Sequence, residues 1–168
     1  MATIRPFKGF RPTPELCSKV AALPYDVMTS KEAREMVKND PYSFLHVDRA
    51  EIDLPENVDI YSKEVYEKAA SNLNKMIEDK VLIQDSKPVF YIYSLTMNGR
   101  EQIGLVVCTS IDEYLNNTIK KHEFTRADKE QDRINHVDYC NANTGPIFLT
   151  YKNQKTIDQI ISKEIEKA

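Results

Sequence analysis

The longest periodic pattern of apolar residues in the chain spans residues 59–80. Apolar side chains recur there every three or four positions and lysine and glutamate lie between them, which predicts an amphipathic helix packed into a core. A second pattern of this kind, at residues 154–167, predicts a final helix. The residues expected to face inward are Tyr61, Val65, Ala69, Leu73, Met76 and Ile77 in the first helix, and Ile157, Ile160, Ile161 and Ile165 in the second.

Two β-rich runs, residues 88–97 and 101–109, are joined by Asn98 and Gly99. An Asn-Gly pair between two such runs is the strongest short-range signal for a β-hairpin, because both residues tolerate the positive φ of a type I′ turn. We therefore predict an antiparallel hairpin near the middle of the chain.

Shorter patterns complete the predicted order of elements. Thr29 or Ser30 starts a helix that runs to about Lys38. Helices and strands alternate along the chain, which predicts the α+β class, with a mixed or antiparallel sheet and flanking amphipathic helices in one domain over residues 1–168. The remaining segments are an edge strand or extended arm at 4–11, a strand or short helix at 16–22, a strand at 43–48, a helical turn at 112–116 and a strand at 147–151.

Polar chemistry is concentrated between residues 119 and 150. Residues 119–124 read as a short strand or strand end, and Thr125 with Asp128 has the spacing of a helix N-cap. In a helix beginning at Arg126, the side chains of Arg126, Lys129, Arg133 and His136 form one stripe. Because the N-terminus of a helix favours anions, this stripe predicts a phosphate or carboxylate site. His122 and Glu123 precede that end of the helix.

The same residues also fit an ordinary solvent-exposed helix. Opposite charges lie three or four positions apart in the pairs Arg126–Glu130, Glu130–Arg133 and Asp132–His136. Such pairs are common on surfaces and contribute little energy. The variety of functional groups at a strand-to-helix junction favours the site, and both interpretations stay open.

A second candidate is Asp26, in the loop LPYDV at residues 23–27. Pro24 disfavours helix at the preceding residue, so the segment is predicted to be a loop or turn. An aspartate in such a loop either accepts a local backbone hydrogen bond or reaches into a site.

Composition narrows the function further. The 168 residues carry a net charge of -3, and this mild acidity argues against nucleic-acid binding, which needs a concentrated basic surface. Only four glycines are present, so a phosphate would be held by cationic side chains and a helix N-terminus and not by a glycine-rich loop. The three cysteines are widely spaced and suggest neither a disulfide framework nor a zinc site. No signal-peptide core or membrane-spanning run is visible, so we expect a cytoplasmic protein.

Several short motifs resemble those of the DUF1015 family of bacterial and archaeal proteins. They are PFKGFRP at residues 6–12, LPYDV at 23–27, EAR at 32–34, His122-Glu123-x-Thr125, Lys129, Asp132-Arg133 and NTGPIF at 143–148. Members of that family are usually more than twice this length, so the resemblance implies the N-terminal segment of a longer architecture. The family is also similar to ParB-like free-serine kinases, which implies a ParB/sulfiredoxin-like fold. The Asp-Gly-His-His-Arg motif that members carry further on is not in this chain.

The resemblance implies phosphoryl transfer on a small hydroxyl metabolite such as serine or phosphoserine, with ATP or ADP and Mg²⁺. Glu123 would act as the general base and His122 would orient it or contact the phosphate. The alternatives are a non-catalytic nucleotide- or anion-binding regulatory module, and a structural domain that pairs with the C-terminal part and would show an exposed apolar patch and form a homodimer. In the enzyme, the phosphate would be held by Thr125, Arg126, Lys129 and Arg133, and Asp26 would face the metal or the substrate.

Overall fold

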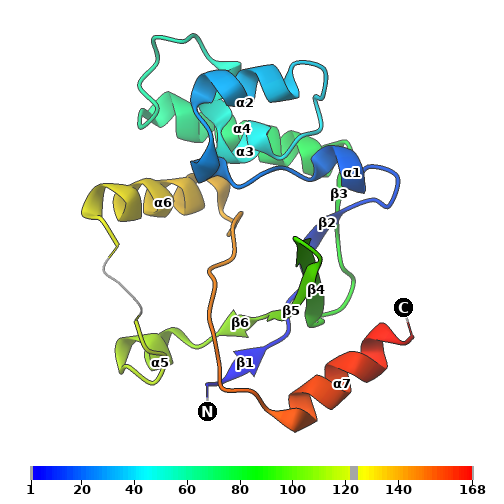
Figure 1. Cartoon of the computed structure of the whole chain (residues 1–168). Coiled ribbons are helices and arrows are strands. Elements are labelled where there is room, and N and C mark those ends of the chain that lie inside the picture. Colours follow the sequence, from blue (N-terminus) through cyan, green and yellow to red (C-terminus); the bar gives the residue numbers. More distant parts are fainter. Residues whose placement is uncertain (1, 122–124, 168) are drawn as a thin grey trace. The chain divides into compact units, whose positions relative to one another are not determined.

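A computed structural model describes residues 2–121 and 125–167 of the chain. Helices and short antiparallel strands are interleaved (Figure 1), which confirms the α+β class. The chain divides into two compact units, each assembled from separate segments and each described by itself. The assignment to a single domain stays a prediction. Unit 1 comprises Met1–Phe7, Val89–Ile119 and Gly145–Ala168, and unit 2 comprises Lys8–Pro88 and Lys120–Thr144.

Unit 2 is mainly helical and contains nearly all of the buried apolar residues described. Its longest helix, α4 (Lys63–Glu78), packs against α6 (Ala127–Cys140). The predicted inward stripe of α4 is largely confirmed, because Val65, Tyr66, Ala69, Leu73 and Met76 are buried. The other elements of unit 2 are β2 (Phe10–Pro12) paired antiparallel with β3 (Leu82–Gln84), α1 (Cys17–Val20), the 3₁₀ helices η1 (Tyr25–Val27) and η2 (Ala50–Asp53), α2 (Ser30–Val37) and α3 (Leu45–Asp48).

The start of α2 follows the sequence closely. The Thr29 hydroxyl accepts a hydrogen bond from the backbone N–H of Glu32, and the Glu32 carboxylate accepts one from the backbone N–H of Thr29. This reciprocal capping box satisfies two N–H groups that a helix start leaves unpaired. The hydrogen bond from the backbone N–H of Thr29, and that from its hydroxyl, lower the pKa of the Glu32 carboxyl.

The strand predicted at residues 43–48 is wrong, because Leu45–Asp48 forms the helix α3. Leu45 and Val47 are both fully buried, but in different places. Leu45 packs with Ala33 and Val37, whereas Val47 belongs to the larger cluster around α4. Residues two positions apart on a helix point in nearly opposite directions. A short helix between two apolar clusters therefore shows the alternation that is typical of a strand.

Helix α6 begins one residue later than predicted, and its cap is different. Arg126 is the N-cap residue, with extended φ and ψ and no side-chain capping hydrogen bond, so the assignment of Thr125 as N-cap is wrong. Asn141 ends the helix in the left-handed conformation, with φ 48°. Of the strand predicted just before α6, Ile119–Lys121 is not a strand and residues 122–124 lie outside the described part.

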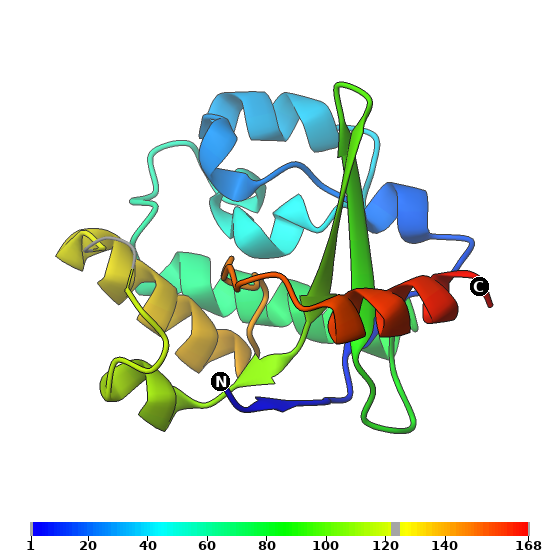
Figure 2. The same ribbon diagram turned by 60° about the horizontal axis from the view of Figure 1, so that its bottom comes forward.

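Unit 1 is built around an antiparallel ribbon of two strands, β4 (Tyr91–Met97) and β5 (Arg100–Val106), which Figure 2 shows side by side. The connecting residues Asn98 and Gly99 have φ 53° and 75°, as both central positions of a type I′ turn require. The other elements are β1 (Ile4–Arg5) paired antiparallel with β6 (Cys108–Thr109), α5 (Ile111–Leu115) and α7 (Lys155–Ile165).

Two predictions in unit 1 are wrong. The segment 147–151 forms no strand, and Ile147 and Phe148 are 76% and 78% exposed. Of the four isoleucines expected to face inward on the final helix, only Ile161 is buried, and Ile160 and Ile165 are exposed. Both follow from one fact: Ile161 is the one buried apolar residue among those described in unit 1, so neither segment has a core to pack against.

Candidate functional site

A pocket of about 370 Å³ lies within unit 2, bordered by η1, the α3–η2 region, the start of α4 and one face of α6. This volume is within the range of small-molecule sites in proteins. Apolar side chains from α3, η2 and α4 form part of the wall, and most other lining residues are charged or aromatic. The polar and aromatic lining residues are Tyr25, Asp26, Asp48, Arg49, Glu51, Tyr61, Tyr66, Lys129, Asp132, Arg133 and His136.

Arg133 is held on two sides. Its guanidinium lies over the ring of Tyr25, with Cζ 4.5 Å from the ring centroid. Its Nε and Nη2 donate hydrogen bonds of 3.2 and 2.8 Å to Oδ2 of Asp132. The other carboxylate oxygen of Asp132 accepts a hydrogen bond of 2.9 Å from the Tyr66 hydroxyl. Burial is the largest of the effects that raise the pKa of Tyr66, so that hydroxyl keeps its proton and remains a donor.

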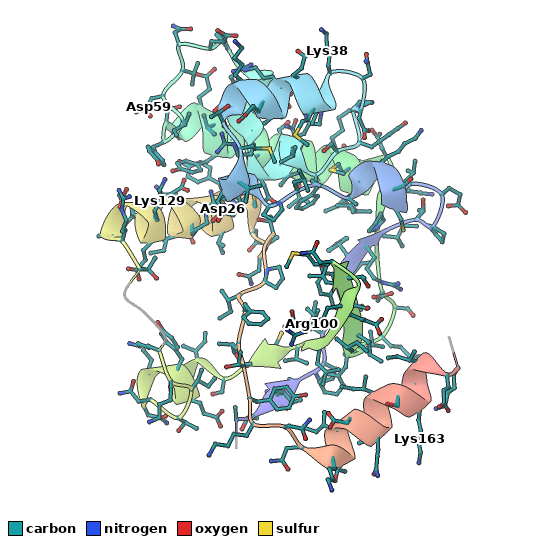
Figure 3. All side chains as sticks on the ribbon, in the orientation of Figure 1. Asp26, Lys38, Asp59, Arg100, Lys129 and Lys163 are labelled. Carbon is teal, nitrogen blue, oxygen red and sulfur yellow. The ribbon has the colours of Figure 1, made fainter. Side chains whose placement is uncertain are left out.

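Lys129, which is labelled in Figure 3, lies on α6. It precedes Arg133 by four residues, about one helical turn. Its Nζ donates a hydrogen bond of 2.6 Å to the Tyr61 hydroxyl and lies 5.2 Å from the centroid of the same ring. The hydrogen bond with Tyr61 raises the pKa of Lys129, so the side chain is a cation at neutral pH. Because Lys129 is exposed, a ligand in the pocket can reach it from solvent.

Arg49 provides a third cation, from the junction of α3 and η2. Its Nη2 donates to the Ser30 hydroxyl at 3.0 Å and its Nη1 to the Tyr25 carbonyl at 3.4 Å. Nε lies 3.0 Å from Oε1 of Glu51, an ion pair whose N–H is not aligned for a hydrogen bond. The Ser30 hydroxyl in turn donates to Glu51 at 2.8 Å. The Glu51 side chain is only 8% exposed, so Arg49 supplies the positive charge that a buried carboxylate needs.

Asp48 contributes a partly buried carboxyl group to the pocket. Burial raises the pKa of this group, and the hydrogen bond with Thr144 and the charges of His136 and Arg133 only partly offset that effect. A carboxyl group with a raised pKa suits general acid–base chemistry, because it takes up and releases a proton closer to neutral pH. His136 itself is buried and donates from Nε2 to the Val47 carbonyl at 3.1 Å, which anchors α6 to α3.

The structure brings together four of the residues singled out in the sequence. Asp26 and three members of the predicted stripe, Lys129, Arg133 and His136, line one pocket, and Asp26 and Lys129 are labelled in Figure 3. Arg126 and Thr125 are not among the lining residues in the described part of the chain, and Arg126 pairs instead with Asp128 at 2.8 Å. His122 and Glu123 lie outside the described residues.

The charge pairs expected along α6 differ from those observed. Arg133 pairs with its neighbour Asp132 and Arg126 with Asp128, so the predicted partner Glu130 is not the one used by either arginine. The predicted Asp132–His136 pair is also replaced, because His136 bonds to the Val47 carbonyl. On the pocket face of α6, Arg133 is thus paired with Asp132, a carboxylate that lines the same pocket.

Sequence reasoning missed Asp48, Arg49, Glu51 and the aromatic partners Tyr25 and Tyr61. Tyr25 lies beside Asp26 in the LPYDV motif, but nothing in the sequence indicates that its ring contacts Arg133. Asp48 ends the segment that alternation assigned to a strand and Arg49 follows it, and no local pattern relates them to α6. Among the described residues, no group of three or more histidines, cysteines or acidic residues is placed to hold a metal ion.

The family model described as "Protein of unknown function (DUF1015)" matches residues 4–168. The chain belongs to the DUF1015 family. No curated protein and no solved structure matches it. The similarity of DUF1015 proteins to ParB-like kinases stays a prediction for this chain. Within the described part of this DUF1015 protein, none of the helices is both long and apolar enough to cross a bilayer.

Proposed function

We propose that unit 2 binds a small phosphorylated metabolite or a nucleotide, as part of a phosphoryl-transfer enzyme that acts on a small hydroxyl metabolite such as serine or phosphoserine. The observation that carries the proposal is the convergence of Lys129 and Arg133 of α6 with Arg49 on one pocket. Phosphoryl transfer depends mainly on positioning the phosphate and stabilising its charge, and cations from separate segments around one pocket supply both.

The three cations have different tasks in this proposal. Arg49 and Arg133 are each paired with a carboxylate, so much of their charge is already balanced and their main contribution is fixed donor geometry. The hydrogen-bond partner of Lys129 is a tyrosine hydroxyl, and no carboxylate ion pair of Lys129 is seen among the described residues, so the charges of Asp128 and Asp132 act on it only from a distance. Lys129 is therefore the residue whose charge a phosphate should need most.

Mg²⁺ is expected to accompany the phosphate. Asp26 and Asp48 line the same pocket, and two carboxylates would repel a bare phosphate. Mg²⁺ typically binds through one or two carboxylates together with phosphate oxygens, and such a site does not require three protein ligands. Asp26 and Asp48 are the residues that would hold the ion, which would supply charge neutralisation to the phosphate.

Transfer also requires a proton acceptor. As the bond between phosphorus and the leaving oxygen breaks and the bond to the substrate hydroxyl forms, the hydroxyl proton passes to a carboxylate. The family resemblance assigns this role to Glu123, with His122 orienting it. Asp48 is the alternative acceptor only where Asp26 alone holds the Mg²⁺ ion, because burial raises the pKa of its carboxyl, whereas a carboxylate bound to Mg²⁺ would not take up the proton.

The proposal is tested by calorimetric titration of the 168-residue protein with ATP, ADP and phosphoserine, each with and without Mg²⁺. We expect micromolar to millimolar binding of at least one ligand, and tighter binding with Mg²⁺. Lys129→Ala should weaken it at least tenfold. The matched control is Arg126→Ala, which removes a cation from the same helix end but not from the lining residues.

Two results would contradict the proposal. Failure of all three ligands to bind, with and without Mg²⁺, would leave the pocket cations as partners of the pocket carboxylates only. An equal loss of affinity in Lys129→Ala and Arg126→Ala would indicate general attraction of anions to this end of α6, without a specific site.

A non-catalytic binding module is the second candidate function. It is favoured by the carboxylate partners of Arg49 and Arg133, which make these two cations fixed hydrogen-bond donors for a bound anion. The two candidates differ in turnover: a module would bind ATP and Mg²⁺ with the same dependence on Lys129 but would transfer no label from [γ-³²P]ATP to serine. Transfer of label by this chain alone would exclude the non-catalytic module.

A further inference from the structure

The outer edge of β4 lacks the features that usually keep an edge strand from pairing. Among the described residues, β4 and β5 form a sheet of only two strands, so each strand has one edge without a neighbouring strand. Proteins commonly protect such edges with charged residues, proline or a bulge. The seven residues of β4, YIYSLTM, contain no charge and no proline, and they pair with β5 without interruption.

The backbone groups available at that edge follow from the register. Met97 faces Arg100 across the two-residue turn, and this pair closes the hairpin with hydrogen bonds between the two strands. Hydrogen-bonded and non-hydrogen-bonded pairs alternate along an antiparallel ladder. The N–H and C=O groups of Ile92, Ser94 and Thr96 therefore point away from β5, toward the outer edge.

Both faces of the ribbon carry exposed apolar side chains. Tyr93 and Leu95 are each 54% exposed on one face, and Ile92 and Ile103 are about 40% exposed on the other. Strands that are apolar on both faces are typical of the interior of larger sheets. A ribbon of two strands is marginally stable at best in water, so this one is expected to have a partner.

We propose that β4 pairs with β4 of a second copy of this chain, in antiparallel orientation about a twofold axis at Ser94. Ser94 then faces Ser94 of the second copy, Ile92 faces Thr96, and Tyr93 faces Leu95. Every outward N–H and C=O of Ile92, Ser94 and Thr96 gains a partner, and no charged side chain is placed opposite another. The result is a continuous sheet of four strands in the order β5–β4–β4–β5, with the self-complementary contact that twofold symmetry requires.

The sequences of the two strands favour self-pairing of two copies at the β4 edge over self-pairing at the β5 edge. The same twofold arrangement about Ile103 would place Arg100 opposite Val106 and Glu101 opposite Leu105, so that charged side chains face apolar ones. At β4 the facing residues are apolar or small hydroxyl residues throughout. Self-pairing is therefore assigned to the β4 edge and not to the β5 edge.

Sedimentation velocity of the 168-residue protein at micromolar concentrations tests the proposal. We expect a dimer of twice the 19.4 kDa chain mass. Ser94→Lys places two lysines opposite each other at the axis and should raise the dissociation constant at least tenfold, giving monomer. The control Gln102→Lys adds the same charge to β5, away from the proposed contact, and should remain dimeric. Far-UV circular dichroism confirms that both variants fold.

A cross-link tests the register independently of any loss of folding. Ser94→Cys should form a disulfide-linked dimer under mild oxidation, because residues facing each other in an antiparallel pair have Cα atoms within disulfide range. Gln102→Cys should not cross-link above the level of the wild type, which has its own exposed Cys17 and Cys108. A wild-type monomer, a dimer unaffected by Ser94→Lys, or open-ended aggregates would each overturn the proposal.

Discussion

The guanidinium of Arg133 lies over the ring of Tyr25, with Cζ 4.5 Å from the ring centroid. This contact joins α6 to the LPYDV loop, two segments that the sequence marked separately. The Tyr25 carbonyl also accepts a hydrogen bond from Arg49, so the loop contacts two of the three pocket cations. The loop thus positions the charges of the site as well as supplying Asp26.

Tyr25→Ala should weaken binding of a phosphorylated ligand, because Arg133 loses the ring that fixes its plane. A cation–π contact contributes about 0.5–2 kcal/mol, which corresponds to roughly a 2- to 30-fold loss of affinity. Tyr25→Phe keeps the ring and the backbone carbonyl and should bind within about twofold of the wild type. Calorimetric titration measures both, and an equal loss in the two variants would show that the hydroxyl, and not the ring, matters.

Tyr66→Phe should destabilise unit 2, since it removes the hydroxyl that donates to Asp132 inside the packed α4–α6 contact. A hydrogen bond to a charged group contributes about 1.5–3 kcal/mol, and the free energy of unfolding in urea should fall by that amount. Tyr139→Phe is the matched control, because its ring contacts Tyr66 but no hydrogen bond of its hydroxyl is seen among the described residues. Equal stability of both variants would contradict the prediction.

Stability should also depend on pH through the ion pair of His46 and Asp53, whose Nδ1 and Oδ1 are 2.8 Å apart. The hydrogen bond with Asp53 raises the pKa of His46 above 6.5. Although burial by itself raises the pKa of Asp53, the hydrogen bond and charge of His46 lower it below 3.8 overall. The ion pair therefore makes its full contribution to stability between pH 3.8 and pH 6.5, the ordinary pKa values of the two groups. Its contribution is lost as pH rises through the raised pKa of His46, and as pH falls through the lowered pKa of Asp53.

Asp53→Asn tests this dependence with little change of shape. The difference in unfolding free energy between wild type and variant should be largest near pH 5.5 and shrink toward pH 8.5, as measured by urea unfolding across the range. Asp138→Asn, which removes an exposed carboxylate from α6, should give a curve parallel to the wild type. A difference for Asp53→Asn that grows above pH 7 would contradict the assignment.

The three cysteines should differ sharply in reactivity. Burial, and to a smaller extent the charge of Asp48, raises the pKa of Cys140 to about 11, so its thiolate is scarce at pH 8. Cys17 and Cys108 are exposed. Titration with Ellman's reagent should detect two thiols in the native protein and three in denaturant. Cys140→Ala should leave the native number unchanged, whereas rapid reaction of three native thiols would contradict the prediction.

The features that were predicted correctly are those that residues close together in the sequence determine. The helix start at Thr29 or Ser30 and the long apolar stripe of α4 are local signals, and the structure bears them out. Lys129 and Arg133 also share a face because of their spacing alone. Local signals fail for α3, where Leu45 and Val47 alternate because they face two different clusters.

The rest of the site depends on contacts between distant segments. Nothing around Asp48 or Arg49 indicates that they will lie beside α6, because that proximity arises when α3 and η2 pack on α4. The N-cap of α6 was missed for a different, local reason: the spacing of Thr125 and Asp128 fits a capping box, but Asp128 pairs with Arg126 instead. Residues 147–151 have the composition of a strand, but among the described residues no strand pairs with them.

The pairing of β1 with β6 has a consequence for the order of events during synthesis. Ile4 lies opposite Thr109, so β1 leaves the ribosome about a hundred residues before its partner. At roughly 5–20 residues per second, that interval lasts about 5–20 s. Unit 1 also needs the segment from Gly145 onward, whereas the last segment of unit 2 ends at Thr144. The pocket-bearing unit can therefore form first, while the first strand of the chain is still waiting for its partner.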